Sequence, residues 1–277
     1  QYPNNITDFW GPRSLAEGKS YTLWLYARDI TLNETDLKID GYTQAQTDVL
    51  TDGVYAVVGY DEGFRVLSTS GANNANAAVR DDRTGKLTNT EEALAGADLS
   101  LTSTQGGVYL TAMTESGPIY LGLGSEGVFR SDAPVLLTVT KNENNTYTLS
   151  AGEAKLAVEN GGFTANAQGS PVQLFLKKAE QPALVRTKAV VEQGYAGTSQ
   201  LAVTGGAEWI YTDAQGAHPA KVEWALTENP DGAFRLENGV LTALKASGAG
   251  TAAGKLVYTQ DKTVGLGTVA LAACGPE

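Results

Sequence analysis

The chain has 277 residues, of which 42% are hydrophobic and 18% are charged. This length and hydrophobic content fit about two folded domains with sizeable cores and exclude an intrinsically disordered chain. The formal net charge is −11 and no window holds a basic patch, which excludes nucleic acid as a partner, because binding to its phosphates needs clustered cations.

Most segments alternate apolar and polar residues, which is the period of a β-strand. The 32 glycines provide turns between these short runs. The sequence therefore predicts an all-β protein, with short helices only near Thr43–Gln46 and Thr90–Leu94. No apolar run approaches the roughly 18 residues of a membrane-spanning helix, so we expect no membrane insertion.

Residues 1–48 contain one clear strand pattern, at Ser20–Tyr26, and too little chain to complete a domain. We expect an N-terminal β segment here, and two interpretations remain open. The segment is either the tail of an upstream domain or a strand packed on the next one. The start, Gln1-Tyr2-Pro3, lacks the basic region and apolar core of a signal peptide. We expect that a signal has been removed or that the chain is a piece of a longer one.

Residues 49–178 contain three similar segments, each with an opening strand, a second strand and a closing strand. The opening strands begin at Asp52-Gly-Val-Tyr55, Gly106-Gly-Val-Tyr109 and Asn144-Asn-Thr-Tyr147. The second strands are Phe64–Leu67, Ile119–Leu123 and Ala154–Val158, and the closing strands are Asp98–Leu101, Pro134–Val139 and Pro171–Leu176. Repeats two and three also share a middle hairpin, with Gly127–Arg130 beside Gly162–Ala165. A polar insertion around residues 72–96 lengthens the first repeat.

Three repeats of about 40 residues with four strands each resemble the β-trefoil modules that are appended to secreted bacterial enzymes and surface proteins. The resemblance implies a β-trefoil-like domain over residues 49–178. In such a fold the repeated Tyr, Phe and Leu would build a pseudo-threefold core. The Gln-x-Trp signature of ricin-type lectins is absent, since the closing strands carry Leu-Ser-Leu, Leu-Thr-Val and Leu-Phe-Leu.

A polar linker with a proline, Ala179–Ala183, separates this region from residues 184–277. The later region contains Val222-Glu-Trp224, Asn238-Gly-Val-Leu-Thr-Ala243 and the glycine-rich Ala246–Gly250. These motifs resemble those of bacterial immunoglobulin-like (Big) domains. The resemblance implies an immunoglobulin-like β-sandwich at residues 184–277, acting as a spacer. The Asn-Gly pair would provide the positive φ angles of a tight hairpin, and Trp224 would fill the core between two sheets.

Residues suited to catalysis or metal binding are scarce. The chain has one histidine, His218, expected in a loop before Pro219, and one cysteine, Cys274. Ser-His-Asp catalysis needs a poised histidine, and zinc sites need several His or Cys ligands. The loose glycine motif Gly122–Gly127 is followed by another expected strand rather than by the helix of a dinucleotide site. We therefore expect no catalytic residue, no metal site and no cofactor.

Exposed aromatic rings are the remaining candidates for binding, because a flat ring can stack on the face of a sugar. Tyr60 is the preferred ring, since Asp61 beside it offers a hydrogen-bond acceptor, and Tyr120 occupies the comparable strand of the second repeat. The other rings considered are Trp10, Trp24, Trp209 and Tyr211.

These observations favour a non-catalytic, extracellular binding segment of a bacterial surface or secreted protein. Its expected partner is a glycan or a surface protein, and the chain is expected to be monomeric. The alternative is a purely structural stalk, or the C-terminal accessory region of a larger secreted hydrolase. An independent enzyme is disfavoured by the lone His218 and by the lack of a nucleophile motif.

Overall fold

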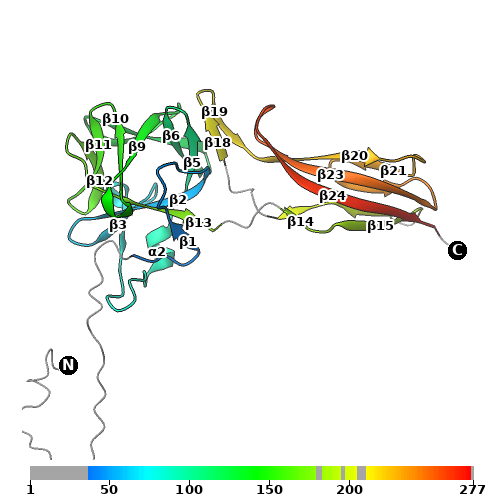
Figure 1. The fold of residues 1–277 in the computed structure, drawn as a ribbon, viewed down its shortest axis with the longest axis horizontal. Coiled ribbons are helices and arrows are strands. Elements are labelled where there is room, and N and C mark those ends of the chain that lie inside the picture. The colour runs from blue at the N-terminus through cyan, green and yellow to red at the C-terminus, as the bar shows by residue number, and fades with distance from the viewer. Residues whose placement is uncertain (1–36, 179–182, 195–196, 205–209, 276–277) are drawn as a thin grey trace, which may run out of the picture. The chain divides into compact units, whose positions relative to one another are not determined.

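Backbone hydrogen bonding confirms the predicted all-β class (Figure 1). The computed structural model describes residues 37–178, 183–194, 197–204 and 210–275, so the strand expected at Ser20–Tyr26 lies outside the described residues. Within those ranges the only α-helix is α2 (Thr90–Leu94), and two short 3₁₀ turns are η1 (Ala72–Asn74) and η2 (Glu143–Asn145).

Six strands form a closed antiparallel ring. In ring order they are β13 (Gln173–Lys177), β2 (Gly53–Tyr60), β5 (Leu99–Thr104), β6 (Gly107–Thr114), β9 (Leu136–Lys141) and β10 (Tyr147–Ala151). The ring closes where Tyr147 and Val172 exchange backbone hydrogen bonds of 2.7 and 2.9 Å, which joins β10 to the residues just before β13. No edge of the ring is therefore left without a backbone partner at this point.

Three hairpins extend from the ring, one for each repeat. They are β3 (Phe64–Leu67) with β4 (Ala75–Ala78), β7 (Gly117–Gly124) with β8 (Gly127–Ser131), and β11 (Ala154–Glu159) with β12 (Gly162–Asn166). Each hairpin is paired to the ring through its first strand. We call the ring and its three hairpins the barrel. The polar insertion predicted in the first repeat contains η1, β4 and α2, so the third strand of that repeat lies inside it.

Large apolar side chains of the repeats fill the barrel. Tyr55 and Tyr147, from two of the three opening motifs, are at most 2% exposed and lie in one cluster with leucines of the closing strands. Their hydroxyls donate to the backbone carbonyls of Thr51 and Thr47, at 3.0 and 2.9 Å. The aromatic bodies are thus buried while the polar tips remain hydrogen-bonded, as burial of a hydroxyl requires.

A second cluster lies on the outer side of β2, β3 and β13. It joins Leu37 and Ile39 to Phe64 and Phe175. Strand β1 (Tyr42–Gln44) pairs with β13, which places these three residues on the barrel. The helix predicted near Thr43–Gln46 is wrong, because so short a helix is unstable alone and β13 offers β1 a backbone partner.

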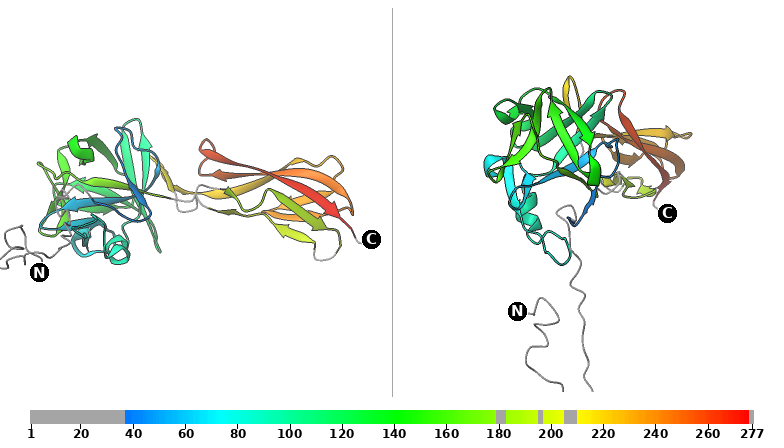
Figure 2. Two further views of the ribbon diagram at one scale, coloured as in Figure 1. Left: turned by 60° about the horizontal axis from the view of Figure 1, so that its bottom comes forward. Right: turned by 60° about the vertical axis from the view of Figure 1, so that its left-hand side comes forward.

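The C-terminal residues form two larger sheets with a common core. One has the order β15 (Lys188–Glu192), β24 (Thr263–Cys274), β23 (Gly248–Val257) and β20 (Lys221–Glu228); the other has β16 (Thr198–Gln200), β22 (Val240–Ala243) and β21 (Phe234–Glu237). Strands β23 and β24 make a long hairpin (Figure 2). A small pair joins β14 (Ala183–Leu184) to β17 (Val203–Thr204). Val191, Phe234 and Leu271 share one buried cluster, against which the partly exposed Trp224 packs.

One further hairpin, β18 (Ile210–Asp213) with β19 (Gly216–Pro219), packs on the barrel. The hydroxyls of Thr212 and Thr111 are 2.9 Å apart and fully buried. Thr102 Oγ1 accepts a hydrogen bond from Thr212 N at 2.9 Å and donates one to the carbonyl of Ile210 at 3.2 Å. His218 lies in strand β19, so the prediction that it lies in a loop is wrong.

Candidate functional site

Tyr60 lies at the end of β2, where the chain turns into β3. Its side chain is 44% exposed, and its ring meets the ring of Phe64, its partner across the hairpin, with centroids 5.2 Å apart at an interplanar angle of 72°. This is the edge-to-face arrangement that aromatic pairs favour. The Tyr60 ring thus packs against Phe64 while part of the residue remains open to solvent.

Asp61 and Arg65 connect this hairpin to the third one. The Gly161 amide donates to Asp61 Oδ2 at 3.0 Å, and Arg65 Nε donates to the Gly161 carbonyl at 3.1 Å. Gly161 follows Asn160 in the turn between β11 and β12, and both residues have positive φ angles. We call these contacts the Gly161 clamp. The predicted acceptor beside Tyr60 thus also holds two repeats together.

The prediction that Tyr120 offers an open ring is wrong. Tyr120 is only 4% exposed, and its hydroxyl accepts a hydrogen bond of 2.7 Å from the Ala217 amide of β19. Its strand also differs from that of Tyr60, which ends the first strand of its repeat, whereas Tyr120 lies in the second. The covering hairpin comes from residues almost 100 positions later in the chain, which a local pattern cannot reveal.

Among the described residues, the one remaining ring considered from the sequence, Tyr211, gives no second open platform. Tyr211 in β18 is partly buried, and Lys262 Nζ lies 5.1 Å from its ring centroid. Trp10, Trp24 and Trp209 lie outside the described residues. Phe129 in β8 is 43% exposed and was not among the rings predicted from the sequence. A detectable signal was the pair of glycines, Gly122 and Gly124, on the strand that faces it.

His218 and Asp213 are hydrogen-bonded in the β18–β19 hairpin, with 3.0 Å between Nε2 and Oδ1. The amides of Gln215 and Gly216 donate to the same Oδ1 at 2.9 and 3.1 Å. Burial raises the pKa of Asp213, but the hydrogen bonds from His218 and from the turn amides outweigh this effect and hold the pKa below its usual range. The carboxylate therefore organises a turn and shows no geometry that points to catalysis.

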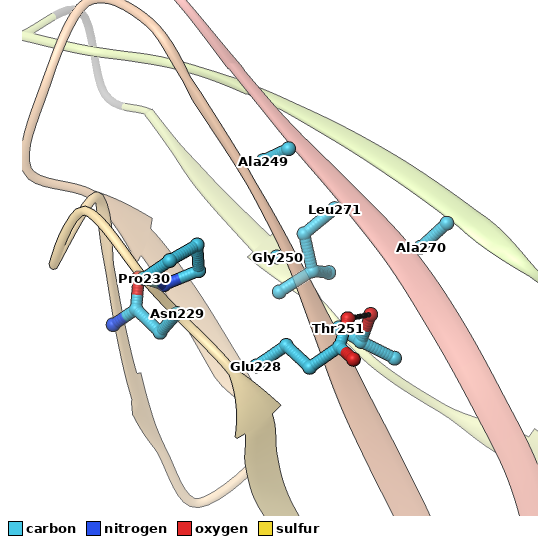
Figure 3. Close-up of a pocket in the computed structure, with 8 residues that line it drawn as sticks. All are labelled: Glu228, Asn229, Pro230, Ala249, Gly250, Thr251, Ala270 and Leu271. Carbon is cyan, nitrogen blue, oxygen red and sulfur yellow. Dashed lines mark hydrogen bonds between the residues drawn. The ribbon is translucent and has the colours of Figure 1, made fainter.

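A hollow of about 820 Å³ lies on the C-terminal sheets (Figure 3). It is lined by Glu228, Asn229, Pro230, Ala249, Gly250, Thr251, Ala270 and Leu271. Thr251 Oγ1 donates to Glu228 Oε2 at 3.0 Å, and the Asn229 side chain bonds both backbone groups of Phe234. The side chains of Glu228, Asn229 and Thr251 thus make hydrogen bonds within the protein, and the hollow does not point to a particular ligand.

Among the described residues, no three His, Cys, Asp or Glu side chains gather as metal ligands would. The helices that the structure describes are all too short to cross a membrane. No protein-family model matches the chain, and no curated protein matches it in sequence. The function must therefore be inferred from the geometry itself.

Proposed function

We propose that the chain is a non-catalytic, extracellular glycan-binding segment of a bacterial surface or secreted protein. Residues 49–178 are assigned to a β-trefoil-like domain, supported by the closed six-strand ring with three hairpins. Residues 184–277 are assigned to an immunoglobulin-like domain, supported by two sheets around one buried cluster. In this proposal the second domain acts as a spacer.

The partly exposed ring of Tyr60, packed edge-to-face with Phe64, is the observation that carries the proposal. A pyranose can place its C–H face against such a ring, because the ring face is electron-rich. Asp61 lies next in the chain, and an ionised carboxylate can accept several hydrogen bonds. Gly161 N occupies one of these positions, which leaves acceptor capacity for a sugar hydroxyl.

We expect weak binding through this site. One stacked ring with a few hydrogen bonds corresponds to a Kd of about 1 mM, or about −4 kcal/mol. Several copies on one surface would raise the overall affinity through effective concentration.

A purely structural stalk, or an accessory region of a larger secreted hydrolase, is the second candidate. It is favoured by the Gly161 clamp, since Asp61 already has a structural role. The two candidates differ in one property, which is whether the chain binds any sugar.

The test is a glycan array with the full chain, followed by calorimetry on each positive glycan. We expect Tyr60→Ala to abolish millimolar binding and Tyr60→Trp to retain it. Val79→Ala, another exposed apolar residue of this region (55% exposed), is the control and should leave binding unchanged. No binding to any glycan at millimolar concentration would overturn the glycan-binding proposal and favour the stalk.

A further inference from the structure

The Phe129 ring lies flat on the backbone of the neighbouring strand. Phe129 in β8 stands directly opposite Gly122 in β7. Ring atoms Cζ, Cε2 and Cε1 lie 2.4, 2.7 and 2.9 Å from the point that a β-carbon on Gly122 would occupy. A ring that pointed at Gly122 with its tip would hold both Cε atoms much farther away than Cζ. The near equality of the three distances therefore shows that the ring face covers Gly122.

Glycine makes this arrangement possible. A β-carbon on Gly122 would overlap the ring, and one on Gly124 would come within 3.3 Å of it. The two glycines thus leave a flat floor on which one face of Phe129 rests. The side chain is nevertheless 43% exposed, so its opposite face is available to a ligand.

Polar residues follow Gly122 and Phe129 on the same face of the hairpin. The next cross-strand pair on this face is Tyr120 with Ser131, because side chains two residues apart share a face. The Tyr120 hydroxyl accepts a hydrogen bond from the Ala217 amide of the β18–β19 hairpin. The turn of that hairpin carries the Asp213 carboxylate and the exposed Gln215. The apolar floor at Gly122 is therefore followed, two residues along β7, by the residue that holds the β18–β19 hairpin.

We propose that Phe129 is the floor of a second carbohydrate site, which takes a neutral, β-linked oligosaccharide of gluco-configured pyranoses. Such pyranoses have equatorial hydroxyls and so present a flat C–H face, which an aromatic face attracts. The β18–β19 turn provides acceptors for the hydroxyls at the sugar edge. The Asp213 carboxylate and the net charge of −11 disfavour an acidic glycan. This inference rests on the proposed glycan binding and assigns it a second site and a sugar class.

The experiment titrates the full chain with cellohexaose and follows the backbone amides by NMR. Phe129→Ala should weaken binding about tenfold, as expected for loss of a stacked ring, and Phe129→Tyr should retain it. Gly122→Ala leaves the aromatic residue in place but forces the ring off its floor, so it should weaken binding similarly. Met113→Ala is the matched control, because Met113 is 49% exposed on the same face of the sheet, and it should change nothing.

Each variant is first compared with the parent chain by thermal unfolding and amide spectrum, so that loss of binding is separated from loss of fold. Binding that survives both Phe129→Ala and Gly122→Ala overturns the inference. If Tyr60→Ala alone abolishes binding, the inference fails while the proposed function stands. Absence of cellohexaose binding at millimolar concentration also overturns the inference, and the glycan array then decides the proposed function independently.

Discussion

At the scale of single residues, charged side chains in this protein hold backbone turns in place. Asp61 binds the Gly161 amide across two repeats, and Asp213 binds two amides of its own turn. Hydrogen bonds from ionised groups are stronger than neutral ones. Such residues therefore contribute to stability even where they lie near the surface.

We expect Asp61→Ala to lower the free energy of unfolding by about 1–2 kcal/mol, because the Gly161 amide loses a charged acceptor. Urea unfolding of the full chain measures the effect. Glu62→Ala is the control, since Glu62 is the exposed neighbour of Asp61 and should change stability by less than about 0.5 kcal/mol. Equal effects of the two substitutions would show that the Gly161 clamp contributes nothing.

The stabilisation that Asp213 provides to the β18–β19 hairpin should depend on pH. Its folded-state pKa is lowered, so the stabilisation is present above the unfolded pKa of about 3.9 and is lost as the pH falls through the folded pKa. The stability difference between the parent chain and Asp213→Asn should therefore shrink from pH 7 towards about pH 2.5. Urea unfolding at a series of pH values measures it. A difference that grows on acidification would contradict the assigned direction.

The sequence motif around Trp224 predicts that this side chain packs on the core, but it does not predict how much of the side chain is buried. The sequence predicts a core residue, whereas the structure places the indole in partial contact with solvent, against Gly239 and Gly254. We expect Trp224→Ala to cost about 2 kcal/mol, less than the 3–5 kcal/mol of a fully buried large aromatic. Val222→Ala, on the same face of β20 and 44% exposed, is the control for urea unfolding. A loss above about 4 kcal/mol would restore the core assignment.

At the scale of elements, the strands of the three repeats could be predicted because their apolar residues alternate. Strand β4 was not predicted, because its sequence, Ala75-Asn-Ala-Ala78, has little apolar alternation. Pairing with β3 determines this strand instead. The same reason applies to β1, which needs β13. Within the candidate site, Tyr60 and Asp61 could be located from the sequence. The burial of Tyr120 depends on a hairpin almost 100 residues later, which local pattern does not specify. The orientation of Phe129 depends on Gly122, its partner in a local hairpin, so the glycines of β7 were a readable signal.

The β18–β19 hairpin is attached through a buried hydroxyl pair, which allows a double-mutant test. Thr212→Val should cost about 1–3 kcal/mol, because it leaves the buried Thr111 hydroxyl without a partner. The double variant Thr111→Val, Thr212→Val should recover most of this loss, since both polar groups are then gone. Urea unfolding of the four chains gives the coupling. Additive losses would show that the two hydroxyls do not interact.

At the scale of the whole molecule, the linker Ala179–Ala183 is not the only connection between the barrel and later residues. The β18–β19 hairpin lies after the linker, yet its hydrogen bonds go to Thr102, Thr111 and Tyr120. Cutting the chain at the linker therefore does not by itself remove these contacts.

We expect a chain cleaved at a protease site engineered into residues 179–183 to elute as one species in size-exclusion chromatography. Both fragments should separate only in denaturant, because the buried hairpin contacts persist after cleavage. The same cleavage in a chain lacking residues 210–219 should release two fragments under native conditions. Separation of the fragments without denaturant in the parent chain would contradict the hairpin attachment.

The late position of this hairpin also sets an order of events during synthesis. The ribosome makes the barrel strands first, but their outer face around Thr102, Thr111 and Tyr120 stays uncovered until Pro219 has emerged. Contacts between segments so distant in sequence form slowly, because a long loop must close. Until then the newly made barrel exposes the hydrogen-bonding groups of these residues to solvent. It is most prone to non-native association during that interval.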